Sequence, residues 1–187
     1  TAYVATGSFG LAIVDASQFR TPTVLSQLDL PGTATDVAVD PSLGIAAVAS
    51  NVGGLHLVDV ANLRQPSLLQ TVNISAGSVE IANGVAYVAA GRQIAAYSVL
   101  TGEFLFQTLL TSSVEEMSLV GNRLYALTST RLHIFDVQPT SLVQLGSVAV
   151  SGLTSPLERG RALFVGDGVA YVGHFEGYNI VDVSNPA

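Results

Sequence analysis

The sequence contains no cysteine, no tryptophan and no lysine, so all seven basic residues are arginines. Without cysteine, the chain can form no disulfide, thiolate nucleophile, cysteine-ligated zinc site or iron–sulfur cluster. Without tryptophan, it cannot carry the tryptophan motifs of quinoprotein dehydrogenases or of tryptophan–aspartate repeats. These absences remove several common classes of metal, redox and repeat protein.

Charge is also scarce, since only 11% of the residues are charged and the formal net charge is −7. An acidic surface repels phosphate backbones, so we expect no nucleic-acid partner.

The apolar stretches are short and interrupted by Gly, Asn or Ser, which predicts no transmembrane segment in this chain. No basic segment is followed by an apolar stretch, so no signal peptide is visible, and we expect that anything upstream has been removed. Low charge, an acidic balance and abundant Ser, Thr and Gly favour an exported protein, extracellular or at the cell surface.

What is present is a repeat with a period of about 40 residues. One apolar segment occurs five times, and its second residues lie at 3, 47, 87, 125 and 171, spaced 44, 40, 38 and 46 residues apart. The copies begin at Ala2, Ala46, Ala86, Leu124 and Ala170. A single globular core with no internal repeat would not produce this regularity.

Three further segments recur at fixed places within each period. One of them ends in an acidic residue at Asp15, Asp59, Asp136 and Asp182, with Ser98 in the third copy. Turn dipeptides such as Asn83-Gly84 and Asp167-Gly168 suit the positive φ angles of tight hairpins. All four segments are rich in Val, Ile, Leu and Tyr, and no stretch has helical amphipathicity with caps.

Four short strands in each period of about 40 residues are typical of a β-propeller blade. The sequence therefore predicts an all-β fold made of four-stranded antiparallel blades. We place the repeats at about residues 1–32, 33–75, 76–111, 112–151 and 158–187, within one propeller domain or fragment.

The segments Leu11–Asp15 and Leu55–Asp59 resemble the motif that gives the LVIVD-repeat family of β-propellers its name. The run from Asp182 to Pro186 strengthens the resemblance, which covers the whole chain. The third copy departs from it with Tyr97-Ser98, and the fourth with Gln138–Thr140. The resemblance implies the fold and an extracytoplasmic setting, but no particular activity.

We label the strands of a blade a to d, in chain order. The phase of the repeats predicts that the chain begins on a b strand and ends just after a c strand. We therefore expect a partial propeller whose parent chain supplies the remaining blades. The alternative is a five-bladed ring with three-stranded end blades.

Most of the chemically interesting residues have a structural interpretation. The repeated aspartates could be metal ligands, but one per blade favours a role in capping the turn between strands c and d. His56 and His133 occupy the same position of strand c in different blades, so they are not expected to share a metal. We predict that both pack between blades or at the surface, and we predict no metal site and no cofactor.

The best candidate for a ligand site lies where b–c turns and d–a connectors share one end of the blades. The longest connector, between the fourth and fifth repeats, carries Glu158, Arg159 and Arg161. The next b–c turn carries His174 and Glu176. Two arginines there would bind a carboxylate or phosphate.

Three functions remain open from the sequence. The first is a non-enzymatic binding, adhesion or interaction module that recognises a protein or carbohydrate ligand. The second is a hydrolase or lyase whose acid and base groups converge at the mouth of the central channel of the predicted propeller. The third is a structural spacer. The absence of a phosphate-binding glycine loop, Gly-x-Ser-x-Gly and His-Glu-x-x-His favours the first.

Overall fold

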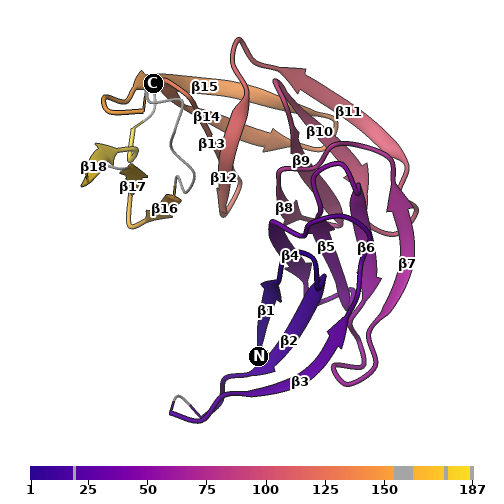
Figure 1. The fold of residues 1–187 in the computed structure, drawn as a ribbon. Coiled ribbons are helices and arrows are strands. Elements are labelled where there is room, and N and C mark those ends of the chain that lie inside the picture. Colours follow the sequence, from indigo (N-terminus) through magenta and orange to yellow (C-terminus); the bar gives the residue numbers. More distant parts are fainter. Residues whose placement is uncertain (19, 154–161, 175–176, 186–187) are drawn as a thin grey trace. The chain divides into compact units, whose positions relative to one another are not determined.

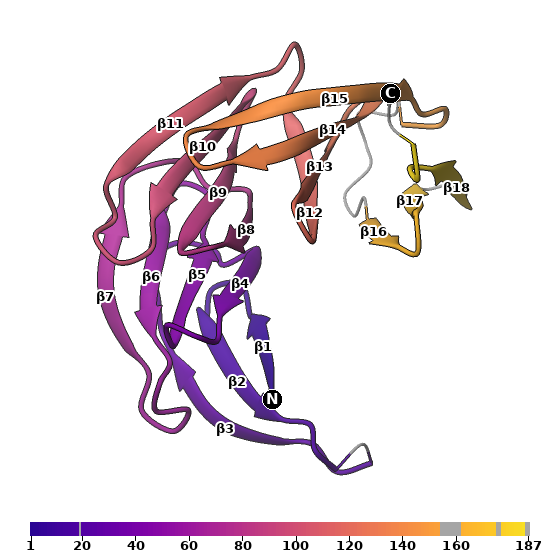
Figure 2. The ribbon, with the colours of Figure 1, turned by 180° about the vertical axis from the view of Figure 1, so that it is seen from behind.

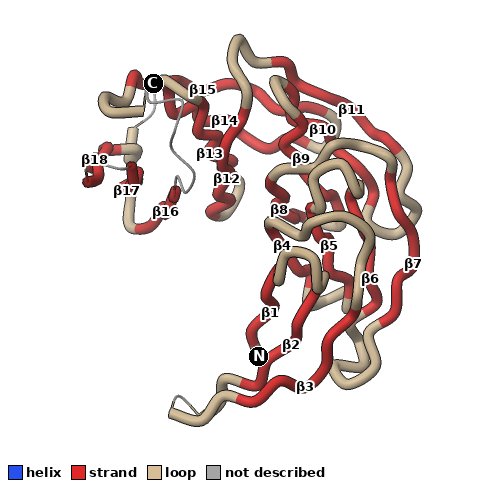
Figure 3. Tube along the Cα trace, in the orientation of Figure 1, coloured by secondary structure: helices blue, strands red, loops and turns tan. Residues whose placement is uncertain are grey.

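A computed structural model describes residues 1–18, 20–153, 162–174 and 177–185. These residues form eighteen β-strands and no helix (Figure 3). The strands are grouped into five antiparallel sheets, in each of which the strands lie side by side in chain order (Figures 1 and 2). The fold is a β-propeller, and each sheet is one blade, as the sequence predicts.

The strands of each blade follow one another along the chain. Blade 1 consists of β1 (Ala2–Ala5), β2 (Leu11–Asp15) and β3 (Thr23–Leu28). Blade 2 consists of β4 (Asp36–Asp40), β5 (Ile45–Ala49), β6 (Leu55–Asp59) and β7 (Ser67–Val72). Blade 3 consists of β8 (Ser78–Ala82), β9 (Val85–Ala90), β10 (Gln93–Ser98) and β11 (Phe104–Leu109). Blade 4 consists of β12 (Val114–Val120), β13 (Arg123–Thr128), β14 (Arg131–Gln138) and β15 (Ser141–Ala149). Blade 5 consists of β16 (Ala162–Gly166), β17 (Val169–His174) and β18 (Gly177–Asp182).

The two end blades have three described strands each, and the three between them have four. The first sheet contains strands b, c and d, and the last contains strands a, b and c. The predicted phase of the repeats is therefore confirmed for the described residues.

Strands a and b are joined by tight turns whose backbone requires positive φ. In blade 3 the turn residues Asn83 and Gly84 have φ of 51° and 75°. In blade 5 the equivalent pair, Asp167 and Gly168, has φ of 52° and 76°. Two successive positive φ angles are those of a type I′ turn, whose twist matches that of the flanking strands. The turn dipeptides thus act as the sequence predicts.

The repeated aspartates cap the c–d turns in three blades. A side-chain oxygen of Asp15 accepts a hydrogen bond from the backbone N–H of Ser17 at 2.9 Å, and Asp59 accepts one from Ala61 at 2.9 Å. Asp182 accepts the equivalent bond from the N–H of Ser184 at 3.0 Å. The prediction of a structural role is confirmed at these positions.

Asp136 corrects the prediction for blade 4. There β14 continues to Gln138 and pairs directly with β15, so Asp136 lies within the hairpin ladder rather than at the start of the turn. The carboxylate instead accepts hydrogen bonds from the side-chain amides of Asn122, at 2.8 Å, and Gln138. The departure of the sequence at Gln138–Thr140 thus replaces a capped turn with a longer hairpin.

A β-bulge recurs between strands c and d of blades 1, 2 and 4. The register shifts between Ile13 and Val14 in blade 1, and at the equivalent steps in blades 2 and 4. The extra residue on strand d is a leucine each time: Leu25, Leu69 and Leu145. Bulges increase local twist, so the outer strand of each blade bends at the same place.

The chain divides into two compact units, which are described separately. Unit one contains Thr1–Ala90 and Ala95–Leu105, and unit two contains Gly91–Ile94 and Phe106–Ala187. Within unit one, successive side chains of β5 and β6 face opposite neighbours, as the period of two in a strand requires. Ala47, Leu55 and Leu57 pack against blade 3, whereas Val48 and Val58 pack against blade 1.

We call the surface of a blade that packs on the next blade its forward face, and the opposite surface its backward face. In unit two, the forward face of blade 4 includes Tyr125, Leu132 and Ile134. It packs against Ala170 and Val172 on the backward face of blade 5. Burial of these apolar faces stabilises the stacking of blades in both units.

Candidate functional site

The b–c turns and the d–a connectors lie at one end of the blades, because the strands are antiparallel. Backbone hydrogen bonds fasten the b–c turns of blades 1, 2 and 3 to the connectors that follow. In unit one, the carbonyl of Gly7 accepts the N–H of Ala34 at 2.9 Å, and that of Asn51 accepts the N–H of Ala76 at 3.0 Å. In unit two, the carbonyl of Gly91 accepts the N–H of Val114 at 2.8 Å. The loops at this end are therefore held in place by the blades.

The three turn residues that present these carbonyls share a left-handed backbone. Gly7, Asn51 and Gly91 have φ of 64°, 48° and 61°. Glycine adopts this conformation without strain, and asparagine tolerates it better than most other residues. The sequence thus selects the residue types that the fastening geometry needs.

A polar side chain in the middle of strand c makes a second connection to the preceding connector. In blade 2, His56 is fully buried, and its Nε2 lies 2.9 Å from the carbonyl oxygen of Pro31. Because a carbonyl only accepts, Nε2 carries the hydrogen, and Nδ1 pairs with the hydroxyl of Thr71 at 2.9 Å. In blade 5, Asn179 stands at the same repeat position and donates to the carbonyl of Ser151 at 2.8 Å. His56 is therefore a packed structural residue, as predicted.

His133 occupies the same position in blade 4, but its ring makes no hydrogen bond to the preceding connector. Its ring is buried and stacked on Phe135, and neither ring nitrogen has a hydrogen-bond partner within the described residues. Burial, and secondarily the charge of Arg131, lower the pKa of His133 below its ordinary value. The ring is thus kept neutral and serves packing.

Asp36 links blades 2 and 3 at the start of strand a. One carboxylate oxygen accepts the hydroxyl of Ser78 at 2.8 Å and the N–H of Val79 at 2.9 Å. The neighbouring hydroxyl of Thr35 donates to the carbonyl of Gly77 at 2.9 Å. These polar contacts complete the connection between the two blades at the loop end.

The structure places one of the predicted site residues, His174, at the end of β17. A Cβ atom added to Gly152 would lie 3.0–3.2 Å from three atoms of the His174 ring, so this ring packs directly over the start of the long connector. The Nδ1 atom of His174 is buried and has no hydrogen-bond partner within the described residues. Gly152 also has a φ of 82°, so a side chain there would be strained as well as obstructed.

The other predicted site residues, Glu158, Arg159, Arg161 and Glu176, lie outside the described residues. Their role in ligand binding stays a prediction, as does that of His174.

Two exposed apolar side chains at this end were missed by sequence reasoning. Phe9, in the b–c turn of blade 1, is 64% exposed, and Val52, in the b–c turn of blade 2, is 89% exposed. Both stand next to glycine in tight turns, in Gly7–Gly10 and Asn51–Gly54. A large apolar residue in such a turn cannot reach the core, and this signal was available in the sequence.

Within the described ranges, no group of three or more His, Asp or Glu side chains is arranged to hold a metal ion. The same residues contain no helix that is long and apolar enough to span a membrane.

Solved structures with the same fold share little sequence with this chain. A computationally designed protein, Ika4, matches with a TM-score of 0.61 at 14% identity, over 81% of this chain and 92% of its own. BamB from Moraxella catarrhalis matches with a TM-score of 0.69 at 14% identity, over 98% of this chain and 57% of its own. Sqt1 from Saccharomyces cerevisiae matches with a TM-score of 0.68 at 13% identity, over 95% of this chain and 54% of its own. The chain therefore spans little more than half the length of these two natural proteins, and the likeness concerns the fold alone.

No curated protein matches the sequence. The model of the LVIVD repeat matches residues 2–28, 31–74 and 159–187, which together make up more than half of the chain. With the blades, the capped turns and the repeat register already established, the chain belongs to the LVIVD-repeat family.

Proposed function

We propose that this protein is a non-enzymatic interaction module that recognises its ligand with the b–c turns and d–a connectors. The observation that carries the proposal is that this end combines fastened loops with exposed apolar side chains, Phe9 and Val52. Exposed apolar groups on a preformed surface bind without a large ordering cost, because the loops are already fixed.

Two features support a protein ligand with acidic groups, and composition supports the setting in which it is met. Phe9 and Val52 offer apolar contact area, and aromatic side chains are common anchors in protein interfaces. The long connector whose Gly152 lies against His174 carries Arg159 and Arg161 in its sequence, and arginine pairs bind carboxylates well. Low charge, an acidic balance and abundant Ser, Thr and Gly support an exported, cell-surface setting for such recognition.

The proposal is tested by selecting a phage-displayed peptide library against the immobilised chain, with a glycan array as the parallel probe. We expect acidic peptides with apolar residues to be selected. Peptides that bind through apolar residues should lose about tenfold or more in affinity in the Phe9→Ser/Val52→Ser variant, and peptides that bind through acidic residues should lose as much in the Arg159→Ala/Arg161→Ala variant.

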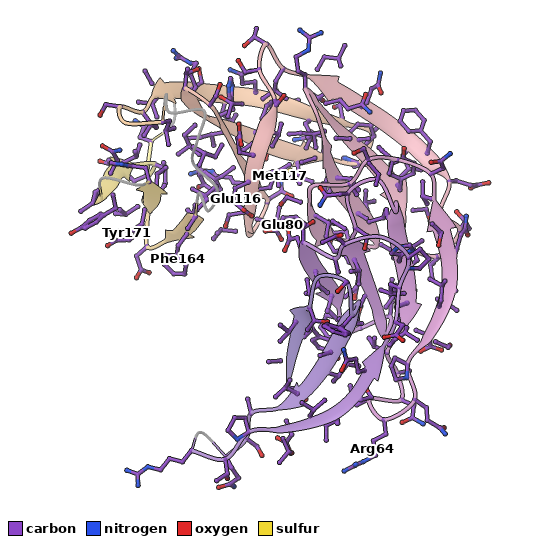
Figure 4. All side chains as sticks on the ribbon, in the orientation of Figure 1. Arg64, Glu80, Glu116, Met117, Phe164 and Tyr171 are labelled. Atoms are coloured by element: carbon purple, nitrogen blue, oxygen red, sulfur yellow. The ribbon has the colours of Figure 1, made fainter. Side chains whose placement is uncertain are left out.

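Matched controls lie at the other end of the blades, in c–d turns. Arg64 is exposed there in blade 2 (Figure 4), and Leu100 is exposed there in blade 3. Arg64→Ala and Leu100→Ser should leave peptide affinity unchanged. Ligands that are sensitive only to the controls, or selection of glycans alone, would contradict the proposal.

A further inference from the structure

The turn between strands c and d of blade 2, residues 60–66, reaches back to the outer strand of blade 1. Its Leu63 packs, together with Leu25 of β3, against the apolar core between blades 1 and 2. The hydroxyl of Ser26 donates a hydrogen bond to the carbonyl of Leu63 at 2.6 Å. A leucine in this turn thus fills a seat on the outer edge of the preceding blade.

The residue after this leucine adds a contact between opposite charges. Hydrogen bonds from Ser17 lower the pKa of Asp15 in blade 1, and the positive charges of the N-terminus and of Arg64 add to this effect. Arg64 therefore lies near Asp15. The pair Leu63-Arg64 docks on blade 1 with an apolar side chain, a hydrogen bond and an opposite charge.

Blade 3 does not cover blade 2 in the same way. Its c–d turn, residues 99–103, is two residues shorter than that of blade 2 and contains no basic residue. Leu100 in this turn is 67% exposed, so it does not take the place of Leu63. Leu69, which corresponds to Leu25 by strand register, is 54% exposed. The seat that is filled on blade 1 is therefore open on blade 2.

We call this open seat the outer notch. It lies between the outer strands β7 and β11 within unit one, and its residues are Leu69, Gln70, Tyr97 and Phe104 (Figures 1 and 2). Tyr97 packs against the core between blades 2 and 3. Phe104 is 54% exposed and lies edge-on against Tyr97, with ring centroids 5.7 Å apart. The turn of blade 3 meets the Gln70 amide with Gly102, which has no side chain to fill the seat.

The polar groups that hold Leu63-Arg64 on blade 1 have counterparts at the outer notch. By strand register, Gln70 corresponds to Ser26, and Asp59 corresponds to Asp15. The amide N–H of Gln70 can donate a hydrogen bond as the hydroxyl of Ser26 does. The turn of blade 3 offers Asp59 no arginine, because it has none in its sequence. The notch therefore repeats an apolar wall, a donor and an acidic group, which on blade 1 hold a leucine and an arginine.

We propose that the outer notch binds a partner protein through a loop or peptide that presents a leucine followed by an arginine or lysine. The notch continues the apolar interface between blades 2 and 3, which pack directly on each other, so it is open because the turn of blade 3 is short. An apolar anchor beside a pair of opposite charges gives affinity from the first and specificity from the second. This site is independent of the proposed surface at the b–c turns and d–a connectors, whose ligand is acidic.

The test is an NMR titration of the nitrogen-15-labelled chain with a cyclic peptide of residues 60–66, which presents the leucine and arginine of the turn of blade 2. We expect the amide signals of Leu69, Gln70 and Phe104 to shift. Phe104→Ser should weaken binding about tenfold or more, because it removes the aromatic wall. Asp59→Asn keeps an oxygen for the turn cap and should weaken binding about threefold, with less dependence on salt.

A peptide with Leu63→Ser is the matched control for the ligand and should not bind. Val24→Ser is the control for the chain and should leave the affinity unchanged, since Val24 is an exposed apolar residue of the outer strand β3, outside the notch. Circular dichroism checks that each variant is folded, and Leu69→Ser offers a second change of the notch. The proposal is overturned if millimolar peptide causes no shift, if the shifts fall only in the b–c turns and d–a connectors, or if the Leu63→Ser peptide binds equally well.

Discussion

Blades 2 and 5 are built from the same repeat, and yet they differ in how much of their surface is buried. Both have the same strand register, and both cap their c–d turn with an aspartate. Blade 2 packs on both faces, and its Leu57 is 1% exposed, whereas the equivalent Ile180 of blade 5 is 61% exposed. The repeat therefore specifies the sheet, while burial and its energy depend on the neighbouring blade.

The largest effect that tests this comparison is truncation of the two equivalent aliphatic residues. Leu57→Ala should destabilise the protein by about 2–5 kcal/mol, because it opens a cavity between blades 2 and 3. Ile180→Ala, measured in dilute solution, should change the free energy of unfolding by no more than about 0.5 kcal/mol. Urea denaturation measures both. Equal losses would show that the face of blade 5 is covered.

The second effect concerns the polar residue in the middle of strand c. His56→Ala should lower the free energy of unfolding by about 2–3 kcal/mol, because it leaves the carbonyl of Pro31 and the hydroxyl of Thr71 without their partner. Asn179→Ala removes one hydrogen bond at a less buried place and should lower the free energy of unfolding by about 1 kcal/mol. His56→Asn should recover part of the loss, since asparagine makes the equivalent bond in blade 5. If His56→Asn is as destabilised as His56→Ala, positions 56 and 179 are not equivalent.

The third effect tests the polar link between blades 2 and 3, for which blade 5 has Ala162 at the repeat-equivalent position. Asp36→Ala should destabilise the protein by about 1–2 kcal/mol, because the hydroxyl of Ser78 and the N–H of Val79 lose their acceptor. The exposed Asp29→Ala is the charge-matched control and should be close to neutral. A similar loss in both variants would point to a general charge effect.

The smallest effect is a pH dependence due to His133. Its pKa is lowered in the folded state, mainly by burial, so the unfolded chain takes up a proton first as the pH falls. His133 should therefore reduce folding stability as the pH drops from about 7.5 to 5.5, through the ordinary pKa of histidine. His133→Phe should flatten this dependence relative to the wild type. The free energy of unfolding is measured by urea denaturation at several pH values. If its dependence on pH is the same in His133→Phe as in the wild type, the charged ring finds a partner in the folded state.

The parts of the fold that could be predicted depend on neighbours in sequence. The strands, the positive-φ turns at Asn83-Gly84 and the caps at Asp15 and Asp59 each follow from a few adjacent residues. Asp136 was predicted wrongly, although Gln138–Thr140 was noted as a departure from the repeat. In blade 4, strand c runs two residues beyond the aspartate, to Gln138, so Asp136 does not stand at the start of the turn as the other aspartates do.

The parts that could not be predicted depend on contacts between repeats. The bond from His56 to the carbonyl of Pro31 and the bond from the N–H of Val79 to Asp36 join residues 25 and 43 positions apart, and no local pattern encodes them. The bulge leucines, such as Leu69, are likewise set by the pairing of two strands rather than by one. For the candidate site, the sequence expected His174 to lie beside the long connector, and the structure brings His174 against Gly152. The role of this place in ligand binding stays a prediction, and the sequence interpretation overlooked the exposed Phe9.

The most direct test of the central claim uses the absence of cysteine, which allows a single thiol to be introduced without background. Leu57→Cys and Ile180→Cys place it at the two equivalent positions, and the rate of labelling by a thiol reagent reports exposure. The account predicts rapid labelling at position 180 in dilute solution and slow labelling at position 57, because Ile180 is exposed and Leu57 is buried. Labelling at position 180 as slow as at position 57 in dilute solution would contradict it.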